Sequence, residues 1–149
     1  MVPTQALINA SAAAIAADAA ALADADFLHV YLIMAAFTPN NNLVIGDLVK
    51  ATFTGAAAKA TITATMQKFT DPQTGEWIIQ IPEPAGGWHW QTTDTANLPQ
   101  TIYGYALTDL NEITLWGSAL LDAPVVLNGV GQGVDIGQVR FRLSQSCLS

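Results

Sequence analysis

The sequence contains few of the residues from which disulfide frameworks and nucleic-acid-binding sites are built. Its 149 residues include one cysteine and five lysine or arginine residues, and only 11% are charged. Because Cys147 is the single cysteine, no disulfide bond can form within the chain. Nucleic-acid binding requires basic residues that neutralise phosphates, whereas this chain has twelve acidic residues and a net charge of −7. We therefore expect no nucleic-acid partner.

Motifs that carry catalysis or hold a metal ion are also missing. No HExxH, CxxC, GxSxG or Walker-type pattern occurs, and these patterns are what place a nucleophile, a base or metal ligands close together. The two histidines, His29 and His89, stand alone in strand-like segments. We interpret His29 as a core or interface residue. The sequence thus predicts a non-enzymatic protein with no catalytic residue, no cofactor and no metal ligand.

Long hydrophobic runs and a basic leader are absent as well. The longest apolar run, residues 27–37, is too short to span a bilayer and contains His29. A secretory signal begins with basic residues, but the first basic residue here is Lys50. We expect a protein made in the cytoplasm, with no membrane partner.

An alanine-rich tract occupies residues 4–25, with no glycine and no internal proline. Alanine has the highest helix propensity, and Ile8, Ile15 and Leu22 recur every seven residues along one helix face. The sequence therefore predicts a helical arm over residues 1–26. The arm either packs on its own domain or docks on a neighbouring subunit, and periodicity does not distinguish the two. The candidate interface residues on the arm are Leu7, Ile8, Ile15 and Leu22.

From residue 27 onward the apolar pattern is that of β-strands. Residues 60–69 alternate between apolar and polar side chains, which is the period of a half-buried strand. Strands are expected over residues 27–37, 48–54, 60–69, 76–81, 101–108, 113–121, 125–127 and 134–143. Residues 27–149 thus predict a mainly β domain, a β-sandwich or barrel of about seven to eight antiparallel strands.

Two hairpins and the orientation of the last strand follow from local pattern. Residues 71–75 provide proline and glycine for a turn between the strands at 60–69 and 76–81. Residues 109–112 separate the two strands of a second hairpin. In residues 134–143 the alternation places Val139, Phe141 and Leu143 inward, and Arg140 and Arg142 outward.

Trp88 and Trp90 are the one aromatic feature that suggests a binding site. Two residues apart on a strand, they project from the same face, with His89 on the other. If exposed, the two rings could stack on a sugar, which would make the domain a glycan-binding module. Aromatic side chains dominate the cores of β-sandwiches, so we favour a core position for both.

Three segments resemble a family of small proteins encoded among the head and structural genes of tailed bacteriophages and prophages. They are VYLIMAAFTPNNNLVIGDLVKATFTGAA at 30–57, PQTIYGYALTD at 99–109 and LLDAPVVLNGVGQGVDIGQVRFRLS at 120–144. The chain departs from the family at Ala57, where an aromatic residue is usual, and its alanine-rich leader is longer. Both departures bear on which surface is used.

The resemblance implies a virion structural protein that oligomerises and binds the major capsid protein or other virion proteins. A capsid decoration, or cement, protein is the first choice, and a tail or fibre component is the second. The composition is compatible with this role, because 51% of the residues are hydrophobic. A chain with little charge and much apolar surface suits an interface that a partner covers.

Overall fold

The computed structural model describes residues 1–6, 29–60, 67–81, 83–109 and 111–143. The chain is mainly β, and all the strand pairings within these residues are antiparallel. The strands are β1 (Val2–Pro3), β2 (His29–Ile33), β3 (Lys59–Ala60), β4 (Gln67–Thr70), β5 (Trp77–Ile81), β6 (His89–Gln91), β7 (Gln100–Thr108), β8 (Leu115–Leu127), β9 (Gly133–Asp135) and β10 (Val139–Leu143). One 3-10 turn, η1, spans Ile45–Asp47.

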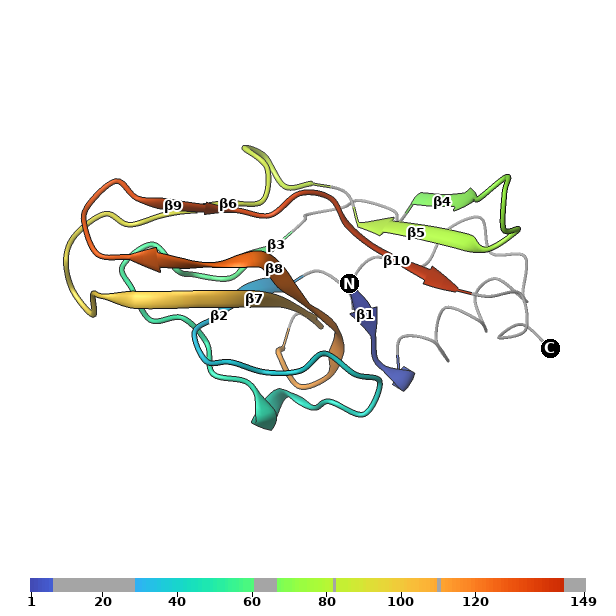
Figure 1. Cartoon of the computed structure of the whole chain (residues 1–149), viewed down its shortest axis with the longest axis horizontal. Coiled ribbons are helices and arrows are strands. Elements are labelled where there is room, and N and C mark those ends of the chain that lie inside the picture. Colours follow the sequence, from blue (N-terminus) through green and yellow to red (C-terminus); the bar gives the residue numbers. More distant parts are fainter. Residues whose placement is uncertain (7–28, 61–66, 82, 110, 144–149) are drawn as a thin grey trace.

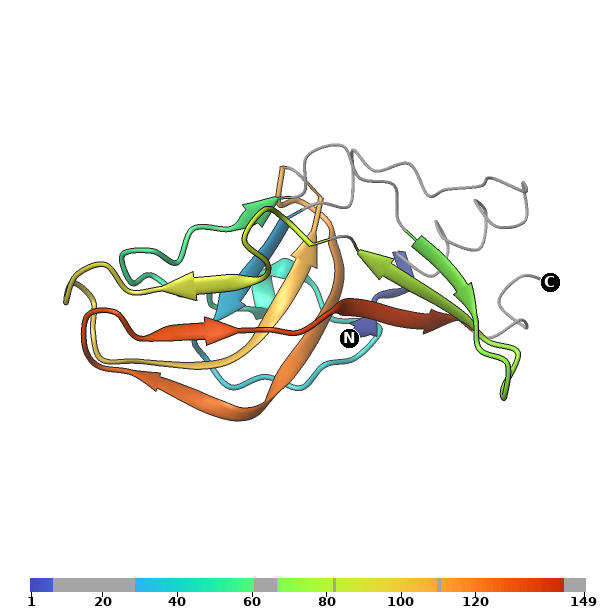
Figure 2. The same cartoon turned by 90° about the horizontal axis from the view of Figure 1, so that it is seen from above.

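The strands form three sheets of different size. The largest has the order β1-β8-β7-β2-β3, the second the order β10-β5-β4, and β6 pairs with β9 alone. Figure 1 shows the β6–β9 pair lying over the end of the largest sheet, above β7 and β8. In both views β10 continues from β9 toward the opposite end of the molecule, where β4 and β5 join it (Figures 1 and 2).

The centre of the largest sheet is buried on both faces. In β2, the four consecutive residues from Val30 to Ile33 are at most 2% exposed. Val30 and Leu32 face one core cluster, and Tyr31 and Ile33 face a second cluster under the loop of residues 34–58. The continuous apolar run at residues 27–37 predicts such a strand, and the structure confirms it over His29–Ile33, while residues 34–37 belong to the loop that follows.

The main core lies between the largest sheet and the strands above it. Its largest fully buried side chains include Trp90 of β6, Ile102 of β7, Leu127 of β8 and Phe141 of β10. Each strand contributes alternate residues to this core, as the pleat requires. The β6–β9 pair and the start of β10 are therefore held to the largest sheet by side-chain packing.

Gly104 allows a close approach within β7. A Cβ atom at this position would collide with the carbonyl oxygen of Ala119 and would lie 2.8 Å from the ring of Phe37. A register shift between Ile102 and Gly104 marks an irregularity in the β7–β8 ladder at the same place. The glycine thus lets the loop after β2 fold over the outer face of the sheet.

Both predicted hairpins are confirmed. Strands β4 and β5 pair across a turn in which the N–H of Gly75 donates to the carbonyl of Asp71 over 2.8 Å. Gly75 has a φ of 71° there, a left-handed conformation that glycine adopts at low cost. The β7–β8 hairpin is also present, and β8 unites the two strands expected at 113–121 and 125–127.

Two predicted strands are wrong in part. Residues 48–54 form a single bridge, between Lys50 and Ile33, because the next backbone groups bond elsewhere. The N–H of Thr52 donates to the side chain of Gln100, and the carbonyl of Thr54 accepts from Thr93. Residues 134–143 form two strands, β9 and β10, which belong to different sheets.

Burial within β10 follows the predicted alternation. Val139 and Phe141 are buried, whereas Arg140 and Arg142 are exposed. The prediction for Leu143 concerns a side chain outside the described part of the structure. The strand predicted over residues 60–69 also lies partly outside the described part of the structure, because β3 ends at Ala60 and β4 begins at Gln67.

The N-terminal residues differ from the predicted arm at its very start. Val2 and Pro3 pair with Ser118 and Gly117 and add a strand to the edge of β8. The buried Thr4 hydroxyl donates to the carbonyl of Leu115 over 2.6 Å. Residues 2–3 are therefore part of the sheet, because the edge of β8 provides partners for their backbone groups. The helix predicted for the rest of the arm falls mostly on residues 7–28, which are not among the residues that the structure describes.

Candidate functional site

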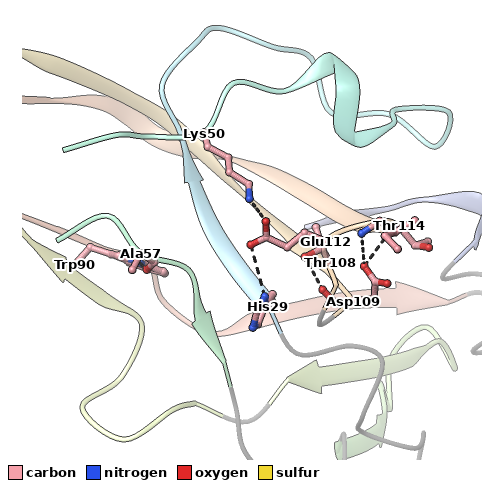
Figure 3. Close-up of polar contacts among 9 residues, drawn as sticks. His29, Lys50, Ala57, Trp90, Thr108, Asp109, Glu112 and Thr114 are labelled. Carbon is pink, nitrogen blue, oxygen red and sulfur yellow. Dashed lines mark hydrogen bonds and ion pairs between the residues drawn. The ribbon is translucent and has the colours of Figure 1, made fainter. Parts of the chain in front are cut away.

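Trp88 and Trp90 are core residues. They are 2% and 1% exposed, and their ring centroids lie 6.4 Å apart at an interplanar angle of 18°. The indole N–H of Trp90 donates to the carbonyl of Ala57 over 3.0 Å (Figure 3). A sugar stacks only on an exposed ring face, and neither ring has one. The structure thus agrees with the core position and removes the premise of the glycan-stacking alternative.

His89 lies on the opposite face of β6, as the strand period predicts. Its Nδ1 atom lies 2.5 Å from Oδ1 of Asp135, directly across the β6–β9 ladder. Both side chains are open to solvent. A single exposed pair such as this stabilises a strand pairing weakly and brings no third polar group to a common point.

The densest polar cluster joins three parts of the chain (Figure 3). Glu112, in the β7–β8 turn, accepts a hydrogen bond from the Lys50 ammonium group. Its other oxygen lies 3.6 Å from Nδ1 of His29, which is too long for a hydrogen bond. The ammonium group also lies 4.7 Å from the centre of the Tyr31 ring. Sequence analysis missed this cluster because Glu112 is far from both partners along the chain.

This cluster has the features of a structural contact. Burial raises the pKa of the Tyr31 hydroxyl to about 12, so the group stays neutral at physiological pH. None of the three grooves described below is lined by His29, Lys50 or Glu112. In the described part of the chain, no three His, Cys, Asp or Glu side chains gather closely enough to hold a metal ion.

A shallow groove of about 340 Å³ lies where the N-terminal residues meet two loops. We call it the neutral groove, because its lining has no charged side chain. The lining residues are Thr4, Gln5, Ala6, Asn41, Asn42, Leu43, Val44, Ile45, Ile113, Thr114 and Leu115. Two further grooves of about 350 and 360 Å³ lie along β8 and beside β10.

Local hydrogen bonds hold two apolar side chains outward at the neutral groove. The carboxylate of Asp109 accepts from the N–H groups of Ile113 and Thr114, over 2.7 and 3.0 Å (Figure 3). Asp47 accepts from the N–H of Val44 over 3.0 Å. Both contacts fix turn backbone. As a result Ile113 is 76% exposed and Val44 57% exposed, although each sits on an ordered turn.

Apolar side chains are also exposed on β8. Beyond Ser118, no described strand pairs with the edge of β8 that faces away from β7. Leu120 and Val126 of this strand are 51% and 56% exposed. Pro124, in the same stretch, has no N–H and so blunts the edge against uncontrolled strand pairing. Contiguous exposed apolar side chains are typical of a protein-binding surface, and Val44 and Ile113 meet this condition because they line the same groove.

The four predicted interface residues of the arm cannot be placed on this surface. Leu7, Ile8, Ile15 and Leu22 lie outside the described residues, and their role stays a prediction. Within the described ranges, no helix has the length and apolar character needed to cross a membrane.

Comparisons with family models, with curated proteins and with solved structures found no match to this chain.

Proposed function

We propose that this chain is a non-enzymatic structural protein of a virion, most specifically a capsid decoration protein. It binds the major capsid protein or another virion protein through the neutral groove and oligomerises on the particle. The observation that carries the proposal is the pair Ile113 and Val44, exposed on hydrogen-bonded turns beside an uncharged groove. Such a surface gains free energy when a partner removes it from water.

The resemblance to phage head proteins supports the virion context. Its three segments include β7, β9 and β10 and most of β2 and β8, and the first of them also supplies the groove wall at residues 41–45. The family likeness therefore falls on the strands that build the main core and on one side of the proposed binding surface.

We propose further that the sheets form a sandwich-like domain. Side chains from the β6–β9 pair and from β10 pack on the largest sheet around a common core. Two β-layers that share one core are the arrangement of β-sandwich proteins. This architecture suits a rigid particle protein, because its binding residues lie on turns at the ends of strands.

The location of the protein is tested on particles released by the cells that encode it. Mass spectrometry should find the chain in purified particles, and immunogold labelling should place it on the heads. Labelling of tails or fibres would favour the tail alternative over decoration. Its absence from particles would refute the virion proposal.

The binding surface is tested with a matched pair of variants. Ile113→Asp places a charge beside the neutral groove, whereas Val130→Asp does so at a 60% exposed residue beyond the other end of β8. We expect Ile113→Asp to weaken co-sedimentation with particles about tenfold, since burying a charge in an interface costs more than 1.4 kcal/mol. Val130→Asp should bind like the wild type. Equal binding by all three proteins would place the interface elsewhere.

A further inference from the structure

Strands β1 and β10 lie side by side in both views (Figures 1 and 2). Each is the last strand of its sheet within the described residues. A groove of about 360 Å³ separates them, lined by Met1, Val2, Pro3, Arg140, Phe141 and Arg142. We call it the cationic groove, because its charged side chains are both arginines.

The charge of this groove is unusual for the chain. Only five of the 149 residues are basic, and the net charge is −7. Alternation along β10 turns Phe141 inward and leaves Arg140 and Arg142 on one outward face. No carboxylate belongs to the lining. Two of the five basic side chains therefore meet at one place in an acidic protein.

The two arginines differ in what they already bind. Arg142 donates to Asp71 over 2.6 Å and contacts Glu76 at 3.4 Å. Arg140 is exposed and has no carboxylate partner among the described residues. Two of the lysines have partners within the chain, since Lys50 contacts Glu112 and Lys59 lies 5.7 Å from the centre of the Trp90 ring. Arg140 thus has a guanidinium group available for an added anion.

The positive charge of Arg140 also acts on the N-terminal side of the groove. The pKa of the Met1 α-amino group is lowered, first by burial and second by the nearby positive charge of Arg140. The guanidinium group therefore acts across the groove toward β1. A carboxylate placed between the two strands would relieve this repulsion.

The lining also restricts the kind of ligand. Val2 and Pro3 of β1 contribute apolar side chains to the lining, and Pro3 has no N–H with which to extend a ladder. Nucleic acid is disfavoured, because two guanidinium groups on a chain of net charge −7 neutralise few phosphates. A protein segment that alternates carboxylates with apolar side chains satisfies both the arginine and these apolar residues.

We propose that the cationic groove binds an extended acidic and apolar segment of a partner protein, with one carboxylate on the guanidinium group of Arg140. This inference rests on the proposed assembly function and adds the chemistry of the partner. The neutral groove then supplies apolar contact, and the cationic groove supplies charge-dependent selection of the partner.

The direct test uses fluorescence anisotropy with a labelled peptide of alternating glutamate and valine, and a control peptide with glutamine for glutamate. Arg140→Gln and Val130→Asp each lower the net charge by one, but only the first removes the guanidinium group, and Val130 does not line the cationic groove. We expect Arg140→Gln to weaken binding of the acidic peptide about tenfold, and Val130→Asp to leave it nearly unchanged. Added salt should weaken binding by the wild type.

Several results would overturn the proposal. Equal affinity of the wild type for the glutamate and glutamine peptides would exclude a carboxylate site. An unchanged affinity in Arg140→Gln would remove the residue on which the site rests. Tighter, Arg140-dependent binding of a single-stranded DNA probe would assign the groove to phosphate. Unchanged thermal melts for both variants confirm that folding is not the cause of any difference.

Co-sedimentation with particles separates this proposal from the proposed function. If Ile113→Asp loses particle binding while Arg140→Gln keeps it, the assembly function stands and the cationic groove is not used. If the wild type binds no particle but binds the acidic peptide through Arg140, the groove stands and the virion role fails.

Discussion

The largest sheet and the β10-β5-β4 sheet differ in how far their described side chains are buried. In the largest sheet, β2 is covered on both faces, and Ala106 and Leu107 on β7 are fully buried although they are consecutive. In the smaller sheet, the side chains described as buried are those of Ile81, Val139 and Phe141, while Phe69 on β4 is 47% exposed. Among the side chains that the structure describes, only the largest sheet has core on both faces.

This difference predicts that substitutions in the two sheets affect different properties of the protein. Packing on both faces contributes most of the hydrophobic free energy, so substitutions in β2 and β7 act on stability. A sheet with an open face keeps exposed side chains such as Arg140, whose changes act on binding. Substitutions of buried residues in the largest sheet should therefore lower the free energy of unfolding much more than substitutions on the exposed face of the smaller sheet.

The largest effect is expected from an aromatic truncation at the centre of the core. Trp90→Ala removes a 1% exposed indole and its hydrogen bond to Ala57, which should cost about 3–5 kcal/mol or abolish folding. The matched truncation Phe69→Ala, on the open sheet, should cost about 0.5 kcal/mol. Urea denaturation measures both. Similar losses in the two variants would show that the sheets are equally packed.

A smaller loss of stability is expected at alkaline pH, and it arises from tyrosines of the largest sheet. Burial raises the pKa of Tyr31 from 10.0 to about 12, and burial also raises that of Tyr105. Between pH 10 and pH 12, Tyr31 is protonated in the folded chain and deprotonated in the unfolded chain. The stabilisation is therefore intact below pH 10 and is lost as the pH rises toward 12. For Tyr31 the loss approaches roughly 2–3 kcal/mol.

The control for this prediction is Tyr31→Phe, which removes the ionising group and keeps the ring. Denaturation midpoints at pH 8 and at alkaline pH should differ less in this variant than in the wild type. Parallel losses in both proteins would mean that deprotonation of Tyr31 does not oppose folding.

The smallest effect is expected at acidic pH in the β10-β5-β4 sheet. A hydrogen bond from Arg142 lowers the pKa of Asp71 below its usual 3.8, with help from the N–H of Gln73. The stabilisation is therefore present above pH 3.8 and is lost as pH falls through the folded-state pKa. Asp71→Asn should reduce this part of the acid dependence, as measured by thermal melts from pH 6 downward. The shift should be modest, since exposed ion pairs contribute little.

Local sequence pattern determined the elements that depend only on neighbouring residues. The β4–β5 hairpin follows from a glycine able to adopt a left-handed conformation at Gly75. The inward position of Trp88 and Trp90, and the outward position of Arg140 and Arg142, follow from the two-residue period of a strand. These features were predicted correctly because their cause lies within a few residues of chain.

Tertiary structure alone decided which distant segments meet. It divided residues 134–143 between two sheets, brought Glu112 to His29 and Lys50, and placed Pro3 beside β10 to form the cationic groove. No local pattern encodes these meetings, because the choice of strand partner depends on how side chains from the whole chain pack into one core. The order of residues shows that the sequence motifs sought are absent, and the fold decided where the grooves lie.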